Sequence, residues 1–99
     1  MRAIVFNAKA RGDLLDIWEY IAAESVDVAD RVVGRIEADI AQLAQMPGMG
    51  HQRADVKDPR LLFWMVRPYV IVYRHTRRTL YVVRVLHGAR DFRRVFRGK

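Results

Sequence analysis

The sequence predicts a small α+β domain in which a helical hairpin packs on a twisted, mainly antiparallel sheet. Three observations lead to this fold class. Two consecutive segments in the first half repeat their apolar residues at helical spacing, three short apolar segments in the second half have the length of strands, and one more opens the chain. With 99 residues, 52% of them hydrophobic, the chain is long enough for one domain, which we expect over residues 1–99 in the order β-α-α-β-β-β.

The chain is expected to open with a short strand over residues 2–6 and a helix over residues 8–24. Asn7 stands between them, where its side chain can accept backbone N–H bonds and cap the helix. The apolar residues of this helix fall at i, i+3, i+4 and i+7: Leu14, Ile17, Trp18 and Ile21. Its outer positions carry acidic residues that we interpret as a solvated face: Asp13, Asp16 and Glu19.

A second helix is expected after a very short connection, with Ser25 or Asp27 as its cap. Its apolar stripe repeats the same spacing over several turns: Ala29, Val32, Val33, Ile36, Ile40 and Leu43. Pro47, Gly48 and Gly50 then end the helix. Two amphipathic helices joined this closely form an antiparallel hairpin.

A polar loop over residues 47–59 precedes three strands, which we expect over residues 61–66, 69–75 and 80–87. Only Arg67-Pro68 separates the first two strands, which favours a tight hairpin. In the last strand, strict alternation places Leu80, Val82, Arg84 and Leu86 on one face and Tyr81, Val83, Val85 and His87 on the other.

Residues 61–66 do not alternate between apolar and polar side chains, although a sheet covered on one face should do so. Something should therefore cover the second face of the sheet. One interpretation is that the C-terminal tail and the loop over residues 47–59 fold over it. The other is an exposed apolar groove that receives a partner chain.

The net charge of +7 is unevenly distributed along the chain. Residues 1–49 contain five Lys or Arg and eight Asp or Glu, a balance of −3, whereas residues 50–99 contain thirteen and three, a balance of +10. Such a basic half is typical of a contact surface for nucleic acid, an acidic protein or an anionic membrane. A basic face that only maintains solubility is the alternative.

Several classes of function are excluded or disfavoured by composition. The chain has no cysteine, which excludes disulfides, thiolate catalysis and zinc-ribbon sites and agrees with a reducing cytoplasm. The apolar runs are too short for a signal peptide or a membrane span, so we expect a soluble cytoplasmic protein without a membrane partner. The three histidines, His51, His75 and His87, lack the spacing of metal sites, and we expect neither a metal nor a cofactor.

One group of residues could bind RNA or single-stranded DNA, because arginines bind phosphate and aromatic rings stack on unpaired bases. It consists of Arg53, Lys57, Arg60, Arg74, His87 and Arg90, with Tyr69, Tyr73 and Tyr81 between them. A metal-free nuclease would also need an acid and a base, and His87 is the side chain that could titrate for that task. The alternatives are a hydrogen-bonded structural role for His87 and core packing for the tyrosines.

Four parts of the sequence together carry a family resemblance. They are Ala10 with Asp13-Leu14, Ile17 and Tyr20-Ile21; Pro47, Gly50 and Arg53; residues 69–74; and residues 85–91. With these residues, nearly the whole chain resembles the RelE/ParE superfamily of bacterial toxins from type II toxin–antitoxin pairs. The last two segments are more similar to the ParE branch than to the RelE branch.

The resemblance implies the fold expected above and two possible activities. The RelE branch consists of ribosome-dependent mRNA endonucleases, whereas the ParE branch consists of inhibitors of DNA gyrase that block replication. It also implies a cognate antitoxin, whose C-terminal segment wraps over the toxin and whose N-terminal part binds operator DNA. A wrapping peptide would use an apolar track, and its acidic residues would meet the arginines.

The residues favour the ParE-like activity. A nuclease would use Arg74, His87 and Arg90, but the tyrosine that the nuclease branch often places near the C-terminus corresponds here to Phe96, whose phenyl ring cannot transfer a proton. The loop contains one lysine, Lys57, where the nucleases usually have several. A third hypothesis is a non-toxic remnant that only binds its antitoxin.

Two sets of contact residues are therefore predicted. The target-binding set is the C-terminal group Arg90, Arg93, Arg94, Phe96 and Arg97. The antitoxin-binding set is Leu62, Trp64, Arg74 and Arg84, with Trp64 as the anchor because large aromatic side chains dominate interface energies.

Overall fold

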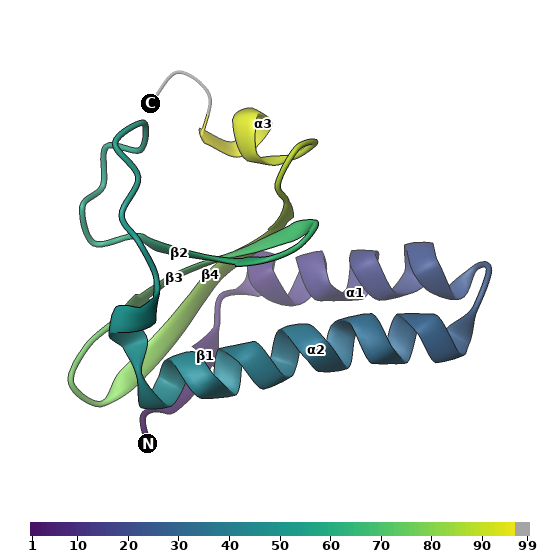
Figure 1. The fold of residues 1–99 in the computed structure, drawn as a ribbon, viewed down its shortest axis with the longest axis horizontal. Helices are drawn as coiled ribbons and strands as arrows, with labels where there is room; N and C mark the ends of the chain where they lie inside the picture. The colour runs from purple at the N-terminus through teal and green to yellow at the C-terminus, as the bar shows by residue number, and fades with distance from the viewer. Residues whose placement is uncertain (97–99) are drawn as a thin grey trace.

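A helical hairpin covers one face of a four-stranded sheet in the computed structural model, which describes residues 1–96 (Figure 1). The elements are β1 (Ala3–Phe6), α1 (Ala8–Ala22), α2 (Val26–Gln45), the short 3-10 helix η1 (Pro47–Met49), β2 (Leu62–Val66), β3 (Tyr69–His75), β4 (Thr79–His87) and α3 (Phe92–Phe96). The predicted α+β class and the β-α-α-β-β-β order are confirmed. The short helices η1 and α3 were not predicted from the sequence.

The sheet has the order β1-β4-β3-β2. β2, β3 and β4 are antiparallel neighbours, whereas β1 runs parallel to β4, with Ala3 opposite Thr79. The sheet is thus mixed but mainly antiparallel, as predicted. β4 lies between β1 and β3, so it joins the N-terminal strand to the antiparallel strands from the second half of the chain.

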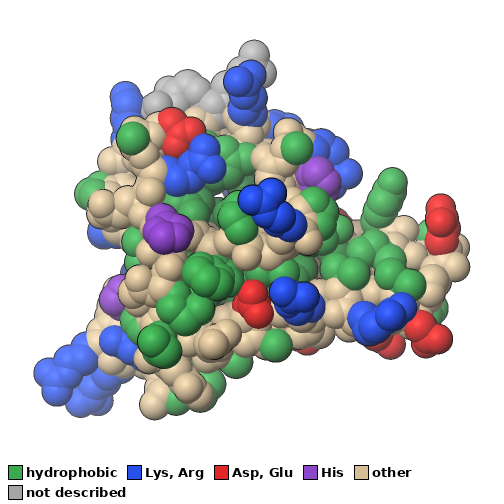
Figure 2. Space-filling model, in the orientation of Figure 1, with side chains coloured by type: hydrophobic (Ala, Val, Ile, Leu, Met, Phe, Trp, Pro, Cys, Tyr) green, Lys and Arg blue, Asp and Glu red, His purple; other side chains and the backbone are tan. Residues whose placement is uncertain are grey.

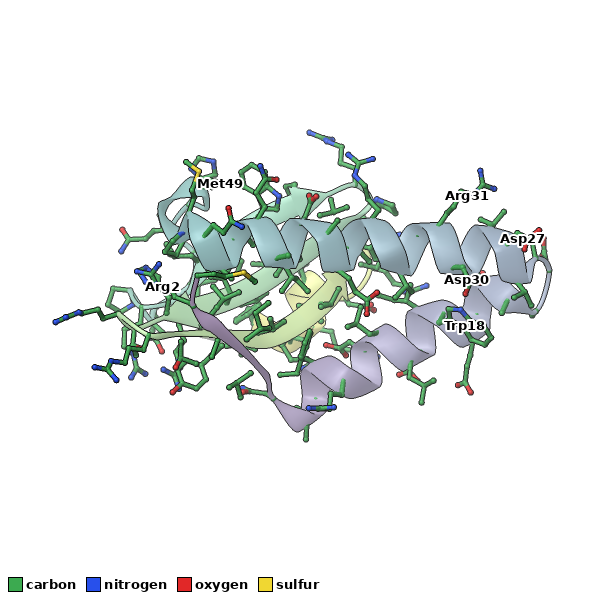
Figure 3. The ribbon with its side chains drawn as sticks, turned by 90° about the horizontal axis from the view of Figure 1, so that it is seen from below. Arg2, Trp18, Asp27, Asp30, Arg31 and Met49 are labelled. Carbon is green, nitrogen blue, oxygen red and sulfur yellow. The ribbon has the colours of Figure 1, made fainter. Side chains whose placement is uncertain are left out.

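The two helices begin in different ways. Ser25 caps α2, because its hydroxyl oxygen accepts the backbone N–H of Val28 at 3.2 Å. Asn7 precedes α1 but makes no side-chain cap bond, so that part of the prediction is wrong. The two helices are also joined across the turn between them. The indole N–H of Trp18 in α1 donates to the carboxylate of Asp30 in α2 at 2.8 Å, and Figure 3 shows these two side chains together.

A β-bulge changes which residues of β4 share a face. Val72 pairs with Arg84 and Tyr73 pairs with Val82, so Val83 has no partner in this register. Strict alternation therefore fails beyond Val83. Val85 lies with the residues that face the helices, and Leu86 faces the opposite side, the reverse of the prediction for both residues.

Both faces of the sheet are covered. The first core lies under the helices and includes Ile36, Ile40, Leu43, Ile71 and Leu80, each no more than 1% exposed. A second cluster lies on the opposite face and consists of Val56, Phe63, Val70, Val72, Leu86 and Phe92. Val56 comes from the loop and Phe92 from α3, so the loop and the tail cover this face. An open apolar groove on that face is therefore ruled out within the part of the chain that the structure describes.

A buried tyrosine joins β3 to the segment after α2. The Tyr73 hydroxyl donates to the Pro47 carbonyl at 2.6 Å and accepts the Gly50 N–H at 2.9 Å. Burial raises the pKa of this hydroxyl and outweighs the hydrogen bond from Gly50, which lowers it. Tyr73 thus has the packing role that was the alternative to base stacking.

Candidate functional site

Charged side chains surround a hollow at the C-terminal end of β4, between α1, the β2–β3 turn and α3. Its volume is about 590 Å³. We call it the His87 hollow; its lining includes Asp13, Asp16, Tyr20, Tyr69, Arg84, His87, Arg90, Asp91 and Arg94. It contains both carboxylates and guanidinium groups, and most of these groups bind each other.

A bidentate ion pair forms one wall of the His87 hollow. The Arg84 guanidinium donates to both carboxylate oxygens of Asp13 at 2.8 and 2.9 Å, and the Val85 N–H donates to the same carboxylate at 2.9 Å. The side chains are only 20% and 14% exposed. The hydrogen bond with Asp13 raises the pKa of Arg84. Asp13 is therefore a link between α1 and β4, and its assignment to the solvated face was wrong.

Asp91 organises the opposite wall. Its carboxylate accepts the His87 backbone N–H at 3.3 Å and bonds from Arg90 and Arg94 at 3.2 and 3.3 Å. Burial acts to raise the pKa of Asp91, but the hydrogen bonds from Arg90 and His87 and the two positive charges lower it overall. Asp91 therefore holds the turn before α3 in place.

His87 is tied into the same turn. Its Nδ1 accepts the Arg90 backbone N–H at 3.2 Å, and its ring meets the Tyr69 ring edge-on at 5.8 Å. In the neutral imidazole, this bond places the proton on Nε2. These contacts support the structural role for His87 that was the alternative to catalysis.

Arg74 lies far from the other two residues of the predicted nuclease set. His87 pairs with Tyr69, and Arg74 lies five residues further along β3, which is about 16 Å at roughly 3.3 Å per residue. Its guanidinium stacks on the Tyr81 ring at 4.1 Å. The fold thus brings His87 and Arg90 together and leaves Arg74 apart.

The loop arginines of the predicted nucleic-acid group are paired locally. Arg53 binds Asp55 at 2.9 Å and stacks on the Phe92 ring at 4.0 Å. Arg60 binds Asp58, and its hydrogen bonds lower the pKa of that carboxyl to about 2. Both guanidinium groups are therefore already bound to carboxylates of the loop.

The predicted target-binding residues divide between surface and interior. Arg90, Arg93 and Arg94 are exposed around α3. Phe96 packs into the second cluster, with its ring centroid 5.8 Å from that of Phe63. Arg97 lies outside the described residues.

The predicted antitoxin-binding residues do not form one surface. Leu62 and Trp64 lie together on the helix-facing side of β2, half-buried, and the Trp64 indole N–H donates to Asp39 of α2 at 3.0 Å. Arg84 is bound to Asp13, and Arg74 stacks on Tyr81.

A groove that was not predicted from the sequence lies between α2 and the β2–β3 turn. It has a volume of about 690 Å³. We call it the α2 groove; it is lined by Val28, Arg31, Val32, Arg35, Met65, Val66, Arg67, Pro68 and Tyr69. Met65 is 48% exposed and Val28 is 38% exposed. The groove exists because the helices extend past the end of the sheet (Figure 1), and helical spacing alone does not show this overhang.

Two further features of residues 1–96 bear on function. They contain no group of three or more His, Cys, Asp or Glu side chains that could hold a metal ion. Their helices include none with the length and apolar character needed to cross a bilayer.

Known proteins resemble this chain in sequence and in fold. Residues 4–92 match the family model of the ParE toxin of the type II toxin–antitoxin system parDE. Toxin ParE3 of Caulobacter vibrioides is 27% identical over 89 residues, which cover 89% of this chain and 88% of that protein. A solved chain described as the chromosomal ParDE TA system from P. aeruginosa shares the fold, with a TM-score of 0.71 at 21% identity, over 88% of this chain and 96% of that one. The chain belongs to the ParE toxin family of type II toxin–antitoxin systems.

Proposed function

We propose that this ParE-family toxin inhibits DNA gyrase by binding it, blocks replication, and carries out no bond chemistry of its own. The observation that carries the proposal is the family match over residues 4–92. The geometry supports binding rather than RNA cleavage. The backbone position of Arg74 is about 16 Å along the strand from that of Tyr69, which pairs with His87, and the His87 Nδ1 already accepts a hydrogen bond.

The proposed target-binding surface is α3 with the turn before it. Phe92 and Phe96 fasten α3 to Phe63, with ring centroids 5.6 and 5.8 Å away. This packing fixes the backbone from which Arg93 and Arg94 project into solvent. Arginines on a rigid support are effective contact residues, because little conformational freedom is lost on binding.

A gyrase supercoiling assay beside a ribosome-dependent mRNA cleavage assay tests the proposal, with toxin freed from its partner. We expect supercoiling to be inhibited while message stays intact. The double variant Arg93→Ala/Arg94→Ala should raise the inhibitory concentration by about tenfold or more. The control Arg31→Ala/Arg35→Ala removes the same charge from exposed positions of α2 and should inhibit like the wild type. Normal supercoiling with wild-type toxin would contradict the proposal.

A ribosome-dependent mRNA endonuclease is the second candidate, because His87 and Arg90 share one hollow. It requires that wild-type toxin cleaves message on translating ribosomes and that His87→Ala abolishes cleavage. If expression without any partner leaves growth normal, both activities fail and the chain is a non-toxic remnant.

We further propose that a cognate antitoxin neutralises the toxin by occupying the α2 groove and the adjacent side of β2. The groove combines exposed apolar side chains with Arg31, Arg35 and Arg67, so it suits an acidic amphipathic segment. Trp64 lies on the same face of β2 as Val66, which lines the groove. Operator DNA would be bound through the antitoxin.

Substitution of Trp64 tests this surface. Trp64→Ala should weaken antitoxin binding by about 2 kcal/mol or more, as measured by calorimetry. Trp64 also binds Asp39 and packs on the core, so its loss could act through stability. Met65→Ala, at an exposed position, should therefore be measured beside it. We expect Met65→Ala to weaken antitoxin binding and to leave the melting temperature unchanged. Unchanged affinity in both variants would place the antitoxin elsewhere.

A further inference from the structure

Three arginines gather at the end of the sheet remote from α3. Arg77 and Arg78 are exposed at the β3–β4 turn, and Arg2 lies beside them from the segment before β1. With Met1 and Gln45 they line a hollow of about 530 Å³, which we call the turn hollow. Figure 1 places this turn and the N-terminus together at lower left, and Figure 2 shows Lys and Arg side chains there without an acidic neighbour on that face.

The charges of the turn hollow are not neutralised. The ion pairs found within residues 1–96 use Arg53, Arg60, Arg84, Arg90 and Arg94, and none of the three arginines of the turn hollow. Among the described residues, no carboxylate lines the hollow either. Like charges held together without a counter-charge create a positive potential that attracts anions.

The backbone beneath these arginines is held in place. The Thr76 N–H donates to the Thr79 carbonyl at 2.8 Å, and the Thr76 hydroxyl accepts the N–H groups of Arg78 and Thr79 at 3.4 and 3.1 Å. Arg2 Nε donates to the Thr76 carbonyl at 2.7 Å, which leaves its terminal nitrogens unbound by this contact. Figure 3 shows Arg2 at this end of the molecule. The guanidinium groups are thus presented from one small, ordered platform.

We propose that the turn hollow binds the phosphate backbone of duplex DNA. Guanidinium groups bind phosphate oxygens in bidentate fashion. As far as residues 1–96 show, the lining has no aromatic side chain on which an unpaired base could stack, which disfavours single-stranded nucleic acid. It also has no large aromatic anchor of the kind that dominates protein interfaces. A backbone contact of this type is independent of base sequence.

This site is separate from the proposed gyrase-binding surface. β4 spans the nine residues Thr79–His87, so its two ends are about 26 Å apart at roughly 3.3 Å per residue. The toxin could hold DNA at one end of β4 and a protein at the other. The inference does not depend on gyrase as the target, since the binding test uses toxin and DNA alone.

Fluorescence anisotropy with a labelled random-sequence 20-bp duplex tests the proposal, using the full chain over a range of salt concentrations. Three phosphate contacts predict a slope of about −2.7 for log K against log salt concentration. Arg77→Ala/Arg78→Ala should lower affinity at low salt by about tenfold or more and reduce the slope by about 2. Arg77→Lys/Arg78→Lys keeps the charge and should keep most of the slope.

Two controls of equal charge make the test specific. Arg31→Ala/Arg35→Ala and Arg93→Ala/Arg94→Ala each remove two charges elsewhere, and each should leave the slope nearly unchanged. If all three double variants weaken binding alike, the turn hollow is not a site. Tighter binding of a single strand than of the duplex, or equal competition by polyglutamate of matched charge, would also overturn the proposal. Matched melting temperatures would show that the variants are folded.

Discussion

At position 50 the chain carries a glycine because Tyr73 occupies the space that a side chain would need. A Cβ built on Gly50 would overlap the Tyr73 hydroxyl and lie 2.9 Å from ring carbons Cε1 and Cζ. The backbone of Gly50 is extended, so its conformation does not require glycine. Glycine is required because the buried Tyr73 hydroxyl approaches so closely.

We therefore expect Gly50→Ala to lower the free energy of unfolding by about 1–3 kcal/mol, because Tyr73 must move and loses its bonds to Pro47 and Gly50. Gly48→Ala is the matched control, since nothing lies within 4 Å of its added Cβ. Urea unfolding measures both. Equal stability of the two variants would show that the Tyr73 contact is not limiting.

Asp91 should make the α3 turn sensitive to acid. Its pKa is lower in the folded chain than in the unfolded chain, so its contacts stabilise the fold above the unfolded pKa and are lost as the pH falls through the folded pKa. The loss should begin below about pH 4. An NMR titration should then show the Phe92 and Val95 signals shifting, and Asp91→Asn should remove that shift. Glu37→Gln, on an exposed part of α2, should leave it intact.

At the scale of elements, the Asp13–Arg84 pair holds α1 against β4 near the β-bulge. Asp13→Ala removes two bonds from a guanidinium and one from a backbone N–H. We expect a loss of about 1.5–3 kcal/mol of unfolding free energy in thermal or urea unfolding. Asp16→Ala, one turn along on an exposed position, should cost less than about 0.5 kcal/mol. Similar losses in both variants would mean that the pair does not hold the two elements together.

The elements that were predicted correctly are those whose sequence patterns are local. Helical spacing over four turns predicted α2, and the 69–75 strand was predicted with the bounds that β3 has. α3 was missed because five residues are too few to show a period. The bulge at Val83 and the Asp13–Arg84 pair were missed for a different reason, since both depend on which distant segment lies opposite, and alternation or helix position does not contain that information.

The site was predicted less well than the fold for the same reason. His87 and Arg90 are close in the sequence and do share a hollow. The α2 groove combines residues of α2 with residues of the β2–β3 hairpin, and its existence depends on how far the helices overhang the sheet. No single stretch of sequence indicates which segments will lie side by side or how far the helices will extend past the sheet.

For the whole molecule, the two apolar clusters should differ in stability. The first core joins long helices to the sheet, whereas the second is closed by one loop and a five-residue helix. We expect hydrogen exchange by mass spectrometry to be slowest in β3 and faster in residues 52–61 and α3, which should open as a unit. Phe92→Ala should speed exchange in that loop and leave β1, which contributes no residue to the second cluster, unchanged. Exchange in α3 as slow as in β3 would contradict this order.

The pairing of β1 with β4 also has a consequence for synthesis. β1 precedes β2 and β3 in the chain, but its partner in the sheet, β4, follows both of them. On the ribosome, β1 must wait until β4 has left the exit tunnel, and a nascent chain cannot complete the sheet before then. We therefore expect the sheet to close, and the surfaces built on it to form, only after all of β4 has been made. The antitoxin proposed above would then find its binding surface on β2 and α2 in final form only once β4 is in place.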